Sequence, residues 1–137
     1  MYRNILIPTD GSELSKKAIQ LAKVLGAKVT GLHVIVEGAV AAGIGKSFYN
    51  ENTAKEAAEA FLDVIATEAR QQGVMHECFY IKGSSPDDEI IKAATSRGCD
   101  LICMVSHGRS GLISGLFGGS ETLHVLTHST IPVLVYR

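Results

Sequence analysis

Short apolar runs alternate with stretches of helical periodicity along this 137-residue chain, and this alternation constrains the fold more than any other feature. Continuous apolar runs of about four to eight residues are typical of buried strands, whereas apolar residues spaced three and four apart are typical of helices. The strand-like runs occupy 4–8, 29–36, 75–81, 101–105 and 131–135. Helical stretches lie between them, at 18–25, at 54–69, from 85 onward and at 120–128. Strands that alternate with helices predict a parallel sheet with right-handed crossovers.

We therefore expect one α/β domain over residues 1–137, doubly wound, with a five-stranded parallel sheet and helices on both faces. The runs at 4–8, 29–36 and 101–105 are almost wholly apolar, as in central strands that helices cover on both sides. The third run contains His76 and Glu77 and the fifth contains Pro132, and such residues are typical of edge strands. The predicted strand order is 3-2-1-4-5. This order makes a topological switch point between the first and fourth strands, where open α/β sheets bind ligands.

Local signals indicate where three of the helices begin. Ser12 follows the first strand and can cap the first helix. Thr53 with Glu56 has the spacing of a capping box for the second helix, and Ser85 followed by Pro86 predicts the start of the third.

Composition argues against several classes of partner. The net charge of −1 leaves no excess of Lys and Arg for a nucleic acid or an anionic membrane surface. No apolar run approaches the roughly 18 residues of a membrane span, and the first residues enter a strand pattern rather than a signal peptide, so we expect a cytoplasmic protein. The three cysteines lack a CxxC spacing, which favours reduced, buried thiols over metal or redox chemistry.

The segment that follows the first strand reads Pro8-Thr9-Asp10-Gly11-Ser12. Gly11 permits a sharp turn, and the turn leaves the Asp10 carboxylate at the switch point. There it could accept hydrogen bonds from ribose hydroxyls or hold a magnesium ion through water. The alternative, equally compatible with the spacing, is that Asp10 only shapes the turn.

Two glycine clusters flank the predicted last helix and the end of the fourth strand. Gly108 and Gly111 follow that strand, and Gly118 and Gly119 precede the helix. Glycines let backbone N–H groups approach an anion, and a helix N-terminus adds a favourable dipole. The clusters together predict a phosphate site, although a glycine loop that binds nothing is the simpler alternative.

The chain resembles the universal stress protein family over essentially its whole length. The resemblance rests on PTDGS after the first strand, CDLICMVSHGRSG at 99–111, GSET at 119–122 and VLTHSTIPVLVYR at 125–137. It implies a site for ATP, with or without magnesium, in which Asp10 lies by the ribose and backbone near Val34 and Met104 flanks the adenine. The residues expected at the site are Pro8, Thr9, Asp10, Val34, Met104, Val105, His107, Gly108, Arg109, Gly118, Gly119, Ser120, Glu121 and Thr122.

Two departures from the family's ATP motif, G-x2-G-x9-G-[ST], bear on that expectation. Val105 replaces the first glycine, and the interval from Gly108 to Gly119 is one residue longer than the motif. A stress-linked interaction module that binds no nucleotide therefore stays open as an alternative. No catalytic residues are predicted, because no group is evident that would orient an attacking water, and ATP hydrolysis would at most be slow.

The fifth strand, over 131–136, is unusually apolar for an edge. An exposed apolar edge usually pairs with another strand, and pairing with a second copy across a two-fold axis is the simplest solution. We expect a homodimer through this strand, as the resemblance also implies.

Overall fold

The computed structural model, which describes residues 2–36, 51–105 and 119–136, contains a five-stranded, all-parallel sheet in the order β3-β2-β1-β4-β5. The predicted fold class and strand order are confirmed. The strands are β1 (Asn4–Pro8), β2 (Lys28–Val36), β3 (His76–Gly83), β4 (Leu101–Val105) and β5 (Val133–Tyr136). The helices are α1 (Ser15–Leu25), α2 (Glu51–Gln72), α3 (Pro86–Ser96) and α5 (Gly119–His128).

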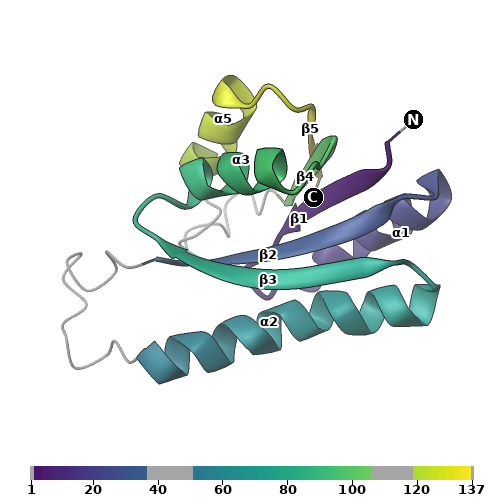
Figure 1. The fold of residues 1–137 in the computed structure, drawn as a ribbon, viewed down its shortest axis with the longest axis horizontal. Coiled ribbons are helices and arrows are strands. Elements are labelled where there is room, and N and C mark those ends of the chain that lie inside the picture. The colour runs from purple at the N-terminus through teal and green to yellow at the C-terminus, as the bar shows by residue number, and fades with distance from the viewer. Residues whose placement is uncertain (1, 37–50, 106–118, 137) are drawn as a thin grey trace.

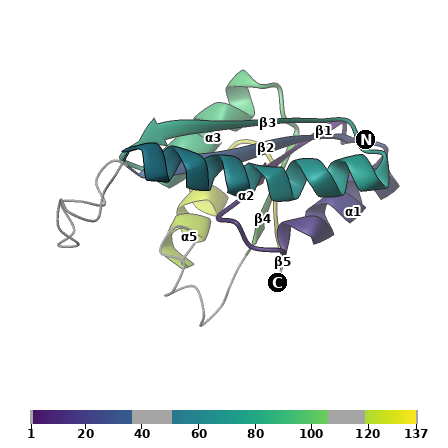
Figure 2. The same cartoon turned by 90° about the horizontal axis from the view of Figure 1, so that it is seen from below.

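Two hydrophobic clusters hold helices to the two faces of the sheet (Figure 1). On one face α1 and α2 cover apolar side chains that include Ile5, Ile7 and Ile65. On the other face α3 and α5 cover a cluster that includes Leu6 and Ile90. Figure 2 shows α2 lying along β2 and β3, and α1 beside it. Successive residues of β1 therefore contribute to opposite clusters, as the alternation of side chains along a buried central strand requires.

The edge strands are β3 and β5, as predicted, but their bounds are shifted toward the C-terminus. Pro132 lies before β5 rather than inside it, and its carbonyl oxygen accepts a hydrogen bond of 3.0 Å from the Ile102 amide. A proline at this point needs no donor of its own, because the ladder uses only its carbonyl group. The ladder residues of β5 pair with β4 from Val133↔Ile102 to Tyr136↔Val105.

Of the three predicted helix starts, that of α3 at Ser85 and Pro86 is confirmed, and the other two differ from the structure. The Ser12 hydroxyl accepts the Leu14 amide at 3.1 Å, but α1 begins only at Ser15. Thr53 lies inside α2, which begins at Glu51, so the predicted capping box is wrong. Ser85 is the N-cap residue of α3, yet its hydroxyl donates to the Asp87 carboxylate instead of accepting a backbone N–H. Side chains at helix starts choose among several nearby partners, and sequence spacing does not decide among them.

At the amino edge of the sheet, polar groups hold the central strands together. The Asp100 carboxylate accepts the Arg3 amide at 2.9 Å and the Asn4 amide at 3.0 Å. The buried Thr30 hydroxyl donates to the Asn4 side-chain oxygen at 2.8 Å. No helix in the described part of the chain combines the length and apolar character that crossing a membrane requires.

Candidate functional site

The loop between β1 and α1 carries Asp10 to the carboxyl edge of the sheet and is fixed by its own side chains. The Thr9 hydroxyl accepts the Gly11 amide at 3.0 Å, and one Asp10 carboxylate oxygen accepts the Ser12 amide at 3.0 Å. Side chains that bond backbone two residues ahead are typical of tight polar turns. Asp10 therefore shapes the turn through one carboxylate oxygen, and its contact with a ribose or a magnesium ion stays a prediction.

His33 in β2 supports the same loop by a hydrogen bond to its backbone. Its Nδ1 atom lies 2.8 Å from the Thr9 carbonyl oxygen, and because that oxygen only accepts, Nδ1 carries the proton. The Thr9 amide in turn donates to the Leu32 carbonyl at 2.8 Å. Burial lowers the pKa of His33, and the Thr9 hydrogen bond and the Asp10 charge only partly oppose that effect. The ring is therefore a neutral, buried donor that ties the loop to β2.

Phe61 in α2 completes the support. Its ring meets the His33 ring edge-on, with centroids 5.1 Å apart and planes at 72°. The same ring lies against Gly11, where a Cβ atom would come within 2.6 Å of the Phe61 Cε1 atom. Gly11 also has a φ of 94°, which side chains rarely adopt. Gly11 is thus required twice, for its backbone conformation and for the aromatic ring beside it.

The expected adenine neighbours lie on the α3 face of the sheet. Val34 in β2 and Met104 in β4 are both 1% exposed and belong to the cluster under α3 and α5. Val105, which replaces the first motif glycine, is also buried. Because side chains alternate along a strand, it faces the side of α1 and not that of Met104. The valine therefore does not occupy the space beside Met104.

Thr122 lies in the first turn of α5, with an exposed fraction of 7%. Its Oγ1 atom is buried and has no hydrogen-bond partner among the residues that the structure describes. Most buried hydroxyls are hydrogen-bonded, since an unpaired one costs about 1–3 kcal/mol. Two residues later, His124 lies 3.4 Å from the Asp87 carboxylate and 3.2 Å from that of Asp88. These contacts attach the beginning of α5 to the beginning of α3, at the carboxyl edge of the sheet.

A second buried hydroxyl lies on the opposite face. The Tyr136 Oη atom has no hydrogen-bond partner in the described structure, and its strand position is opposite Val105. Burial raises the pKa of this phenol, and the neighbouring Cys103 and Asp10 raise it further. Tyr136 was not among the predicted site residues.

The structure does not test every predicted site residue. Pro8, Thr9 and Asp10 end β1 or follow it, and Gly119, Ser120 and Glu121 form the first turn of α5. His107, Gly108, Arg109 and Gly118 lie outside the described residues. That the two glycine turns converge on one ligand stays a prediction.

Sequence reasoning missed His33 and Phe61, which position the Asp10 loop. His33 is a polar residue inside an otherwise apolar central strand, and a buried polar side chain needs a partner. That signal was available in the sequence, although the identity of the partner was not. Phe61 looked like an ordinary core residue of a helical stripe.

Cysteine and metal chemistry find no support in the described part of the chain. All three cysteines are free, and burial raises the pKa of each thiol, to about 12 for Cys103. No group of three potential ligands is placed to hold a metal ion in that part. His124 and His128 stack with ring centroids 4.0 Å apart, which confirms that they share a helix face.

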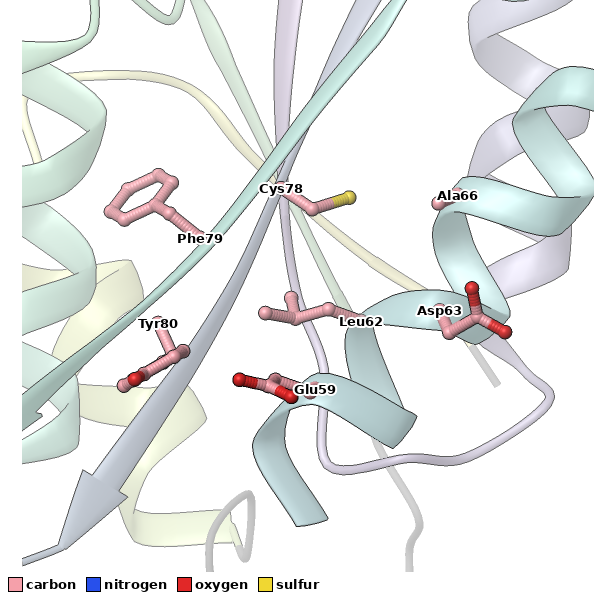
Figure 3. A pocket seen from close by; sticks show the side chains of 7 residues that line it. All are labelled: Glu59, Leu62, Asp63, Ala66, Cys78, Phe79 and Tyr80. Carbon is pink, nitrogen blue, oxygen red and sulfur yellow. The ribbon is translucent and has the colours of Figure 1, made fainter. Parts of the chain in front are cut away.

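A groove of about 480 Å³ lies away from this site, between α2 and the edge strand β3 (Figure 3). Its α2 side consists of Glu59, Leu62, Asp63 and Ala66, and its β3 side includes Cys78 and Tyr80. It is separate from the Asp10 loop and from α5.

Comparison with known proteins matches the whole chain to one family. The model of the universal stress protein family matches residues 1–137. Universal stress protein MJ0577 of Methanocaldococcus jannaschii is 34% identical, with 100% of this chain and 96% of that protein covered. Universal stress protein YxiE of Bacillus subtilis is 33% identical, with 100% of both chains covered. The solved structure of MJ0577 has a TM-score of 0.76 at 35% identity and covers 98% of this chain and 95% of its own.

Three more distant structures share the fold and were solved with adenine nucleotides. A universal stress protein in complex with cAMP has a TM-score of 0.69 at 22% identity, and covers 99% of this chain and 97% of its own. One from Archaeoglobus fulgidus in complex with dAMP has a TM-score of 0.64 at 18% identity, and covers 99% of this chain and 98% of its own. One from Arabidopsis thaliana with AMP bound has a TM-score of 0.66 at 16% identity, and covers 97% of this chain and 90% of its own.

Proposed function

The chain belongs to the universal stress protein family, and from this premise we propose that it is a regulatory protein that binds ATP at the carboxyl edge of its sheet, between β1 and β4. Strand order supports this position, because the chain leaves β1 toward β2 and β3 and later returns to place β4 on the other side of β1, which makes a switch point there. The Asp10 loop forms one wall of the site. The first turn of α5 forms another.

The observation that carries the proposal is the buried Thr122 hydroxyl, which has no hydrogen-bond partner within residues 2–36, 51–105 and 119–136. It lies in the first turn of a ten-residue helix, where backbone N–H groups lack intrahelical acceptors. A phosphate placed there would accept hydrogen bonds from those amides and from Thr122, and the helix dipole would favour its charge. A polar group that is unsatisfied without ligand and satisfied with it contributes directly to affinity.

The loop that carries Asp10 supports the proposal in a second way. His33, Phe61 and the loop's own hydrogen bonds hold it in one conformation through contacts within the protein. A preformed loop has little ordering entropy left to lose when a nucleotide binds. The Asp10 carboxylate would then accept hydrogen bonds from the ribose hydroxyls, or reach a magnesium ion through water.

The relatives support the choice of an adenine nucleotide. Structures of the same fold contain cAMP, dAMP and AMP, and these ligands share adenine and a phosphorylated ribose. We propose ATP for this chain because the paired glycine clusters suit a longer phosphate chain than a monophosphate has.

Mass spectrometry of the purified, denatured protein tests the proposal by detecting adenine nucleotide carried through purification. A thermal-shift titration with ATP, ADP, AMP and cAMP, each with and without magnesium, ranks the ligands. A ligand at about 100 times its dissociation constant adds about 2.7 kcal/mol of stability, which raises the Tm by several degrees. If no nucleotide shifts the Tm at millimolar concentration, the alternative of a nucleotide-free interaction module is correct.

We also propose that the protein is a homodimer through β5. This strand pairs with β4 alone in the described sheet, so its other edge can accept a strand. Leu134 on it is 42% exposed, which is high for an apolar residue of a strand. Burial of that edge against a second copy would remove both the exposed side chain and the unpaired backbone groups from water.

A further inference from the structure

The outer edge of β3 is open beside the groove that α2 forms. Within the described sheet β3 pairs only with β2, so alternate N–H and C=O groups along its other edge have no strand to bond. His76 and Glu77 at its start and Lys82 near its end are charged or polar residues that discourage pairing there. The intervening stretch, 78–81, is apolar and half-buried. A strand added to the sheet would pair with the open backbone edge of β3 at these four residues.

The groove beside this stretch has an apolar floor and an acidic rim. Leu62 and Ala66 of α2 face Cys78 of β3, whose sulfur points toward the helix in Figure 3. Glu59 and Asp63 lie one helical turn apart and are both exposed. No cation pairs with either carboxylate in the described structure; the Asp63 carboxylate accepts only the Thr67 hydroxyl, at 3.4 Å. Among the described residues neither carboxylate of the rim makes a salt bridge, and Arg70 donates to the same Thr67 hydroxyl, at 3.2 Å, and not to Asp63 itself.

The groove on the other face of β3 has the opposite character. Its cations are already paired: Lys92 lies 3.7 Å from the Glu89 carboxylate, and Arg97 lies 3.8 Å from that of Glu77. The Arg97 guanidinium also stacks on the Phe79 ring, 3.9 Å from its centroid. Both cations among the described residues that line this groove are therefore already paired. The two faces of β3 thus differ in what they recognise.

We propose that β3 accepts an extended segment of a partner protein as a sixth strand, with Arg or Lys side chains of that segment over Glu59 and Asp63. Alternate side chains of a strand point to opposite faces, so basic residues at every second position would all reach the α2 groove. Uncharged residues between them would lie on the face of Phe79. Backbone pairing supplies affinity in this mode of recognition, and the alternating side chains supply specificity.

The probe is a set of capped heptapeptides with Arg at alternate positions and Thr, Val or Ala between. Titration into the 15N-labelled full-length protein is followed by NMR. We expect the largest shifts at the amides of 78–81. The double variant Glu59→Gln, Asp63→Asn should bind roughly tenfold more weakly, the effect of losing two exposed ion pairs. The control Glu68→Gln, which also removes an α2 carboxylate but lies outside the groove, should leave affinity unchanged.

Two further ligands separate strand addition from simple charge attraction. The same peptides methylated at alternate backbone nitrogens keep their charge but lose the donors that a ladder needs, and should not bind. Spermidine, a flexible cation without a peptide backbone, should bind at least tenfold more weakly than the peptides. The proposal is overturned if no peptide shifts the β3 amides at millimolar concentration, if either of these ligands binds as tightly, or if the double variant binds like the native protein. None of these outcomes depends on nucleotide binding.

Discussion

The imidazole of His33 donates from Nδ1 to the carbonyl oxygen of Thr9 across 2.8 Å, and so joins β2 to the loop that carries Asp10. The bond lies inside the protein, with His33 5% exposed and Thr9 3% exposed. A neutral histidine here supports the candidate nucleotide site without contacting the ligand. It is a positioning residue.

Replacing His33 with Phe retains an aromatic ring but removes the donor. The Thr9 carbonyl then loses its partner in a buried place, so we expect the free energy of unfolding to fall by about 1–3 kcal/mol. Affinity for ATP should fall as well, because the Asp10 loop is less well fixed. Urea unfolding and a calorimetric ATP titration measure the two effects. An unchanged stability would show that the Thr9 bond contributes nothing.

Stability should depend on pH through His33. The folded protein keeps this ring neutral with a lowered pKa, while the unfolded chain takes up a proton near pH 6.5. The unfolded state thus binds more protons as the pH falls below about 6.5, and stability must fall with it. Above that pH the contribution is fully present. Urea unfolding from pH 5 to pH 8 should show this slope, and His33→Phe should reduce it. An equal slope in both proteins would rule out His33 as its source.

Gly11→Ala should destabilise the protein more than Gly26→Ala. Both glycines have positive φ angles, of 94° and 68°, so both variants strain the backbone by about 1 kcal/mol or more. A Cβ at Gly26 meets nothing within 4 Å, whereas one at Gly11 collides with the Phe61 ring. Overpacking of this kind adds about 1–3 kcal/mol. The difference between the two variants in thermal or urea unfolding isolates the collision, and equal losses would show that the ring moves aside freely.

Thr122→Val removes a hydroxyl that has no partner in the described part of the chain, so the ligand-free protein should be unchanged or slightly more stable. Its affinity for ATP should fall roughly tenfold, by the loss of one hydrogen bond to a charged group. Thr30→Val is the matched control, since that hydroxyl donates to Asn4 and its loss should destabilise the protein. Calorimetric ATP titration and thermal unfolding of both variants make the comparison. Full ATP affinity in Thr122→Val would place the phosphates elsewhere.

Leu134→Lys tests the proposed dimer. A charge on the exposed edge of β5 would have to be desolvated when two copies pair, so we expect the variant to be monomeric. Because Leu134 is 42% exposed in the single chain, the monomer itself should remain folded. Sedimentation equilibrium gives the mass of both proteins, and circular dichroism checks the fold. A native protein that sediments as a monomer contradicts the proposal outright.

The architecture of this protein could be predicted from its amino-acid sequence, because architecture follows from local periodicity. The apolar runs and helical stripes predicted the order of elements, and the polar residues His76 and Glu77 placed β3 at an edge. Backbone conformation and burial of a segment depend mainly on residues close in sequence, so such patterns can be read along the chain.

Only the tertiary structure decided which distant residues support the site. His33 meets Thr9 24 positions away. Phe61 of α2 contacts Gly11 in the loop between β1 and α1, and no periodicity in the sequence predicts that contact. The same holds for Thr122, whose position was predicted but whose hydroxyl is known to lack a partner only once its surroundings are packed. Hydrogen bonds and ring contacts depend on side-chain positions to within a fraction of an ångström, and close packing of the whole core sets those positions.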